Sequence, residues 1–140
     1  MPATQFQGVS PTGADIAAQL DNNGGQIVKP YAFGSKDWRY AAAAGGIVNT
    51  AAVAIKAAAG AGVRNALTAI QISNAHASVA TEVTVSDGAT VIWRNHLAAG
   101  TRMDVEFPTP LLGTANTALN VACVTTGAAV YINAQGYTTT

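Results

Sequence analysis

Few side chains in this sequence have the types and spacing that chemistry at a site requires. The two histidines, His76 and His96, have no second histidine or cysteine at a spacing typical of metal ligands. No Gly-x-Ser-x-Gly motif marks a serine nucleophile, although sequence order alone leaves open a base and an acid that converge in space. The residues therefore predict no metal site, no cofactor and no catalytic residues. A hydrolase that depends on His76 or His96 is the enzymatic alternative.

Three glycine runs have the composition of phosphate-binding loops but lack their functional residues. They are Gly24-Gly25, Gly45-Gly46 and Gly60-Ala61-Gly62. None is followed by the lysine and the serine or threonine that would hold a nucleotide and Mg²⁺. These runs more simply indicate chain reversals. Seven carboxylates would allow a glycosidase pair, but aromatic residues make up only 6% of the chain and offer few platforms for a sugar.

The charge balance argues against two kinds of partner. Seven Lys and Arg offset seven Asp and Glu, so the chain has no net charge and no basic surface for nucleic acid. No apolar run is long enough to cross a membrane, and the N-terminus does not have the pattern of a signal peptide. Charged residues make up 10% of the chain, against about 25% in typical domains. A surface so poor in charge suggests that a protein partner covers part of it.

The single cysteine lies in a predicted strand rather than in a reactive setting. Cys123 alternates with Leu119 and Val121, which predicts a buried, inert thiol. With no second cysteine, the fold contains no internal disulfide.

The elements that would position these side chains are short strands between Gly62 and Tyr137. The clearest segment runs from Glu82 to Arg94, where two β-rich runs flank Asp87-Gly88, a pair suited to a type I′ hairpin turn. Further strands are expected at 47–56, 65–73, 101–107, 118–125 and 128–135, with Pro108 and Pro110 in an edge segment. Seven or eight strands at this spacing indicate an all-β fold, an antiparallel sandwich or barrel, and we favour a jelly-roll sandwich.

The first forty residues have a different composition from the rest. Prolines and glycines interrupt them, and only Asp15 to Leu20 could form a helical turn. We therefore expect an extended N-terminal arm over 1–40 and a β domain over 41–140, joined by the Ala- and Gly-rich segment 41–46. An arm of this kind can be ordered by a neighbouring subunit. Its aromatic anchors, our candidate interface residues, are Phe6, Tyr31, Phe33, Trp38 and Tyr40. The alternative is that the arm wraps its own domain, with Trp38 and Tyr40 beneath the domain's sheet.

Several segments, in this order, resemble small virion proteins of tailed bacteriophages, in particular capsid cement (decoration) proteins. These segments are Asp37–Tyr40, Ile47–Val53, Leu67–Asn74, Val105–Leu111 and Ala129–Tyr137. The resemblance implies a jelly-roll protein made in the host cytoplasm that sits on the outer surface of the icosahedral head. It would form a homodimer and clamp neighbouring subunits of the major capsid protein. The resemblance implies no catalytic residues.

A second function from a different class is a receptor- or carbohydrate-binding module of a phage tail or head fibre, because such domains also resemble modules of those proteins. Exposed aromatic residues in loops 74–80 or 113–117 would favour this function, and these loops contain none.

Overall fold

The computed structural model describes residues 7–9, 15–17 and 36–140. The chain divides into two units, Met1–Ala32 and Phe33–Thr140. In the first unit, β1 (Gln7–Val9) pairs with β2 (Asp15–Ala17) in an antiparallel ladder. The predicted helical turn that begins at Asp15 is therefore wrong. Residues 15–17 instead pair across a ladder, which suits the β-branched Ile16.

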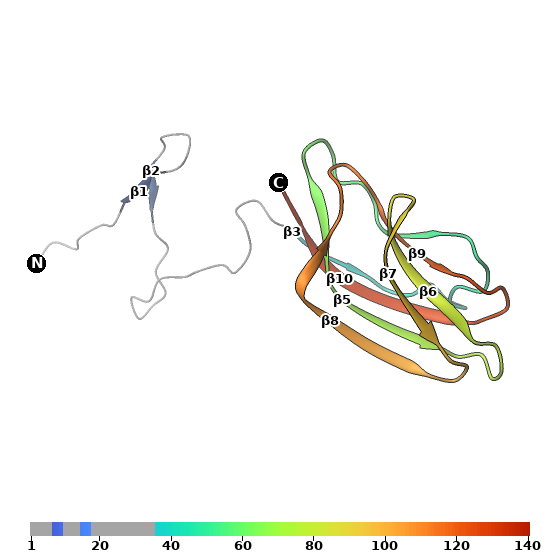
Figure 1. The fold of residues 1–140 in the computed structure, drawn as a ribbon. Coiled ribbons are helices and arrows are strands. Elements are labelled where there is room, and N and C mark those ends of the chain that lie inside the picture. Colours follow the sequence, from blue (N-terminus) through green and yellow to red (C-terminus); the bar gives the residue numbers. More distant parts are fainter. Residues whose placement is uncertain (1–6, 10–14, 18–35) are drawn as a thin grey trace, which may run out of the picture. The chain divides into compact units, whose positions relative to one another are not determined.

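The second unit is a sandwich of two four-stranded antiparallel sheets (Figure 1). One sheet has the order β3-β10-β5-β8 and the other the order β4-β9-β6-β7. The bounds are β3 (Lys36–Tyr40), β4 (Val53–Lys56), β5 (Arg64–Asn74), β6 (Thr81–Asp87), β7 (Thr90–Leu97), β8 (Arg102–Leu112), β9 (Leu119–Cys123) and β10 (Val130–Thr139). The prediction of an all-β, antiparallel sandwich is confirmed, and no helix occurs in the described ranges.

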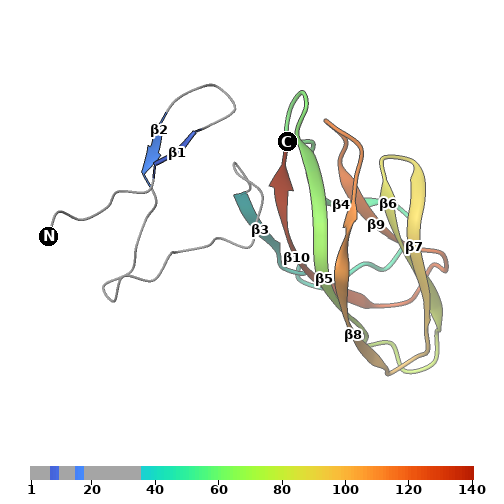
Figure 2. The ribbon, with the colours of Figure 1, turned by 60° about the vertical axis from the view of Figure 1, so that its left-hand side comes forward.

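The chain passes from one sheet to the other at almost every connection, so most consecutive strands are not neighbours within a sheet. Among the strands of the second unit, only β6 and β7 are adjacent both in sequence and in a sheet, while β3 lies beside the last strand, β10 (Figure 2). Consequently β9 and β10 do not pair with each other. The hairpin that the short connection Thr126-Gly127 predicts between these two segments is therefore wrong. Their buried apolar residues contribute to one core from opposite sheets.

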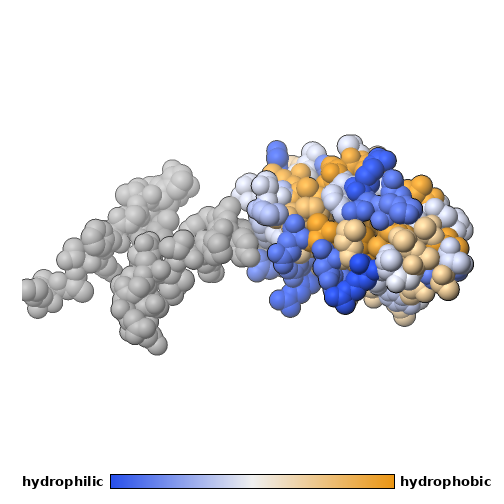
Figure 3. Space-filling model, turned by 60° about the horizontal axis from the view of Figure 1, so that its bottom comes forward, coloured by the Kyte–Doolittle hydropathy of each residue, from blue (hydrophilic) through white to orange (hydrophobic). Residues whose placement is uncertain are grey.

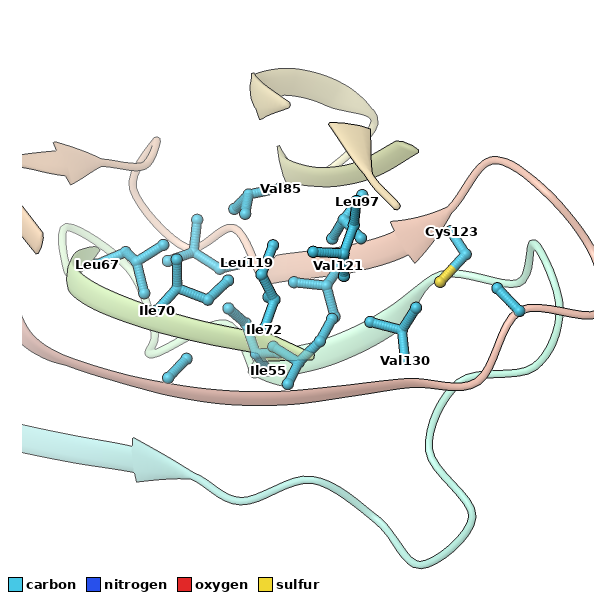
Figure 4. Close-up of a cluster of buried hydrophobic side chains, with 14 of the residues drawn as sticks. Ile55, Leu67, Ile70, Ile72, Val85, Leu97, Leu119, Val121, Cys123 and Val130 are labelled. Carbon is cyan, nitrogen blue, oxygen red and sulfur yellow. The ribbon is translucent and has the colours of Figure 1, made fainter. Parts of the chain in front are cut away.

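The core lies between the two sheets and consists mainly of aliphatic side chains (Figure 4). Most strands contribute alternate residues to it, as the pleat requires, and the register shift after Leu67 in β5 places Leu67 and Ile70 three residues apart in the core. Along the β7–β8 side, Trp93 and Phe107 meet edge to face, with ring centroids 6.1 Å apart. The buried members are Trp38, Ile55, Leu67, Ile70, Ile72, Val83, Val85, Leu97, Leu119, Val121, Cys123, Ala128, Val130, Ile132 and Ala134.

The predicted hairpin between β6 and β7 is present, but its turn lies one residue later than expected. Asp87 pairs with Thr90, so the two-residue loop is Gly88-Ala89 rather than Asp87-Gly88. Gly88 has a φ of 59°, whereas Ala89 has no positive φ. This is the pattern of a type II′ turn, in which glycine occupies the first central position.

The long strand predicted over 47–56 is only partly formed. Strand β4 begins at Val53, and upstream of it Ile47 makes a single bridge to Val130. Asn49 explains the interruption, because its side-chain oxygen accepts the backbone N–H of Ala51 at 2.9 Å. Such local bonds compete with strand pairing and favour a bend.

The segment Lys36–Tyr40, which we assigned to the arm, belongs to the domain. It forms β3 at the edge of a sheet, paired with Ala134–Thr138 of β10. The cause is burial of an aromatic ring, since the Trp38 side chain is only 7% exposed and lies in the core. The domain therefore begins before the predicted boundary at 40/41.

Candidate binding site

The outer face of the β3-β10-β5-β8 sheet carries a band of polar side chains in two neighbouring rows. The pairing register places Arg39, Gln135 and Glu106 in one row, with Ala69 between the last two. Asn133, Gln71 and Asp104 form the next row. All these side chains point away from the core because they alternate with buried residues along their strands.

A shallow groove of about 490 Å³ follows these rows. On the face of the domain turned to the viewer in Figure 3, hydrophilic residues lie in clusters with apolar surface between them. Small and apolar residues form part of the lining, and Ala69 lies at the centre of the band. The groove is lined by Arg39, Tyr40, Ala41, Ala69, Ile70, Gln71, Asp104, Val105, Glu106, Asn133, Ala134 and Gln135.

Hydrogen bonds connect the polar groups of the second row. The Asn133 side-chain amide donates to Gln71 Oε1 at 3.3 Å, and Asn133 Oδ1 accepts the backbone N–H of Ala42 at 3.1 Å. A hydrogen bond from Gln71, followed by one from Arg102, lowers the pKa of Asp104. The Arg102 guanidinium lies 2.9 Å from Asp104 Oδ2. These contacts orient the amides and keep the carboxyl group ionised.

The outer face of the β4-β9-β6-β7 sheet differs in character. Its centre consists of small, uncharged residues, with Ala122 beside Thr84 in one row and Ala54, Asn120 and Ser86 in the next. An ion pair between Arg94 and Glu82 at 3.3 Å, with His96 beside it, lies toward the β7 edge. Val91 is 40% exposed on β7, and Val124 is 57% exposed just after β9. This face is therefore smooth and mostly without charge.

Of the candidate interface residues, two can be placed in the structure. Trp38 lies in the core, and the half-buried Tyr40 packs against it. Their positions agree with the alternative expectation that they lie beneath the domain's own sheet. Phe6, Tyr31 and Phe33 lie outside the described residues.

The histidines have local roles in the loops and strands. His76 Nδ1 accepts the backbone N–H groups of Ser78 and Val79, at 3.1 and 2.9 Å, so this nitrogen organises its own loop. His96 lies on the outer face opposite Glu82. Among the described residues, no three His, Cys, Asp or Glu side chains cluster closely enough to hold a metal ion.

Cys123 is buried as predicted, and its burial raises the pKa of the thiol above its ordinary value of 9.0. Because the neutral thiol is favoured in the fold, this stabilisation is complete below the unfolded pKa and is lost as the pH rises toward the folded pKa. We expect native protein to resist alkylation by iodoacetamide at neutral pH and to react once unfolded in guanidinium chloride. The stability advantage of wild type over Cys123→Ala should shrink above pH 9.0. A native thiol that reacts like free cysteine would contradict this assignment.

The sequence alone did not identify the groove. The alternation does indicate that two of the groove residues point outward. Gln71 lies between Ile70 and Ile72, and Asn133 lies between Ile132 and Ala134. From the sequence, Asp104 and Glu106 alternate with Met103, Val105 and Phe107, which indicates no more than a solvent-exposed face. Which strands lie side by side follows from the topology, and without the topology these residues cannot be assembled into one site.

The described part of the chain is an all-β sandwich domain with two chemically distinct outer faces. Models of known protein families and curated proteins give no match to this sequence. Within residues 7–9, 15–17 and 36–140, no helix has the length and apolar character needed to span a membrane.

Proposed function

We propose that this chain is a structural virion protein that binds the outer surface of a tailed-phage head and cements neighbouring subunits of the major capsid protein. The observation that carries the proposal is the smooth face of the β4-β9-β6-β7 sheet, where exposed Val91 and Val124 accompany a centre of small, uncharged side chains. Small, uncharged side chains with exposed apolar residues among them are compatible with a protein contact site. Glu82 and Arg94, charged side chains of this face, are paired with each other toward the β7 edge, so the centre of the face can approach a shell closely.

We also propose that the sandwich is a jelly roll. The sheet orders β3-β10-β5-β8 and β4-β9-β6-β7 support this, because in each sheet an early strand pairs with a late one. Two Greek keys of this kind wound from eight strands make a jelly roll, an architecture common in viral capsid and lectin domains. The fold supports a virion role only by analogy.

Repetition on a lattice would make a weak contact sufficient. Once one copy of a linked assembly is bound, its neighbours bind at a raised effective concentration. A homodimer, our proposed assembly, would present two such faces. In the same proposal the aromatic residues Phe6, Tyr31 and Phe33 add contacts between subunits, whereas Trp38 and Tyr40 stabilise the domain itself.

A charge at the centre of the smooth face tests the proposal. We expect Ala122→Glu to reduce binding to phage heads assembled without the protein by about tenfold or more, because the carboxylate would lose its hydration on contact. Copies per head would be counted by quantitative gel after sedimentation.

The matched control is Ala69→Glu, the same change at the centre of the opposite outer face. Both alanines are half-buried on the middle strands of their sheets. The control should coat heads as wild type does. Equal coating by both variants, or no binding of wild-type protein to heads, would overturn the proposed function.

A further inference from the structure

We propose that the groove on the outer face of the β3-β10-β5-β8 sheet binds a neutral, polyhydroxylated ligand, namely an oligosaccharide. This inference is independent of the capsid proposal, which uses the opposite face. The groove carries hydrogen-bonding groups of both kinds in two adjacent rows, with Gln71, Asn133 and Gln135 as amides and Asp104 and Glu106 as carboxylates. The groove therefore has more hydrogen-bonding side chains, and more kinds of them, than the centre of the opposite face.

The chemistry of these groups matches hydroxyl-rich ligands. Each amide both donates and accepts, and an ionised carboxylate accepts through two oxygens. A sugar hydroxyl also donates and accepts, so neighbouring hydroxyls can bond to one planar side chain at two points. Adjacent strands lie about 4.8 Å apart and same-face residues about 6.7 Å apart, so the two rows form a lattice of bonding positions at the scale of a sugar ring.

The polar groups are oriented before any ligand arrives. Asn133 bonds to the backbone of Ala42 and to the side chain of Gln71, and Gln71 lies directly opposite Asp104 in the β5–β8 ladder. Groups that are already fixed lose less conformational entropy on binding.

The local charge balance selects a neutral ligand. Arg39 and Glu106 line the groove, and Arg102 pairs with Asp104 at its side. Two positive and two negative groups therefore cancel. A strongly anionic chain would meet the two carboxylates, and a cationic one would meet the arginines, so neither has a net attraction.

The groove also has apolar surface for the carbon-bound faces of sugar rings. Ala41 and Ala69 line the groove, and their small side chains leave it open where larger ones would fill it. On β10, Tyr131 and Tyr137 share the outer face with Asn133 and Gln135 and lie on either side of them. They are about 20 Å apart along the strand, which allows an extended ligand of several sugar units. Loops 74–80 and 113–117, where the sequence would have placed a sugar site, are not needed.

Binding to the isolated full-length protein provides the test, so its outcome does not depend on phage heads. We expect hits among neutral oligosaccharides on a glycan array, with affinity then measured by titration calorimetry. Gln71→Ala should weaken binding about tenfold, because it removes a hydrogen-bonding group and releases its neighbours. Ala69→Trp should abolish binding by filling the groove.

Two arginines provide a matched control. Arg39 and Arg94 are both exposed on edge strands, but only Arg39 lines the groove. Arg39→Ala should lower affinity several-fold and Arg94→Ala should leave it unchanged, with melting temperatures near that of wild type for both variants. The inference is overturned if no neutral glycan binds, if only sialylated or sulfated glycans bind, or if Ala69→Trp binds as wild type does.

Discussion

Gly136→Ala is expected to lower the free energy of unfolding by about 3 kcal/mol, the upper range for overpacking a well-packed core. A Cβ at this position would collide with the backbone oxygen of Ala66 and lie 2.6 Å from Trp38 Cζ2. Moving either neighbour would cost energy, because Ala66 is hydrogen-bonded in the β5–β10 ladder and the Trp38 ring is packed in the core. Strand β3 would have to move away from β10, exposing the ring.

Urea unfolding followed by tryptophan fluorescence would measure this effect. The control is Gly62→Ala, where a Cβ meets nothing but φ is +75°. That backbone strain alone costs about 1–2 kcal/mol. If Gly136→Ala is no more destabilising than Gly62→Ala, the close packing of Trp38 on Gly136 does not hold β3 in place.

This pair also shows what the sequence could and could not predict. Alternation and turn residues are local, so β5, β6 and β7 were predicted close to their true positions, whereas β8 continues past its predicted end at Phe107, through Pro108 and Pro110, to Leu112. Trp38 and Gly136 are opposite each other in the β3–β10 ladder although nearly the whole domain separates them in sequence. The pairing of β3, the first strand of the domain, with β10, the last, leaves no local pattern in the sequence. For this reason β3 was assigned to the arm.

The same limit applies to the two faces. The alternation in β8 correctly placed Asp104 and Glu106 outside, but it could not show that Gln71 and Asn133 lie beside them. Trp38 was named as an interface candidate because it belongs to a group of aromatic residues, Tyr31 to Tyr40, at the end of a segment interrupted by prolines and glycines. Only the topology shows that a sheet covers it.

Strand β5 begins and ends near a buried asparagine, and both side chains serve the loops. At one end, Asn74 donates to Val79 O at 2.8 Å and accepts the backbone N–H of His76 at 3.1 Å. At the other end, Asn65 is fully buried and donates to Ala57 O and Thr117 O, each at 3.0 Å. The two amides therefore donate hydrogen bonds to loop carbonyl groups that are not paired in either sheet.

Asn65→Ala is therefore expected to lower the free energy of unfolding by about 3 kcal/mol, because two partly buried carbonyls would lose their donor. Asn65→Asp should be worse at neutral pH, since it has nearly the same shape but places a carboxylate against those oxygens. Thermal and urea unfolding would measure both, with the exposed Asn133→Ala as the control that changes stability little. If Asn65→Asp were as stable as wild type, the donor role of the amide would be excluded. The two loops would then be held without the Asn65 amide, for example by the backbone bonds from Gly113 to Asn65 and from Asn116 to Val63 and by the bonds of Thr114 to Asp87.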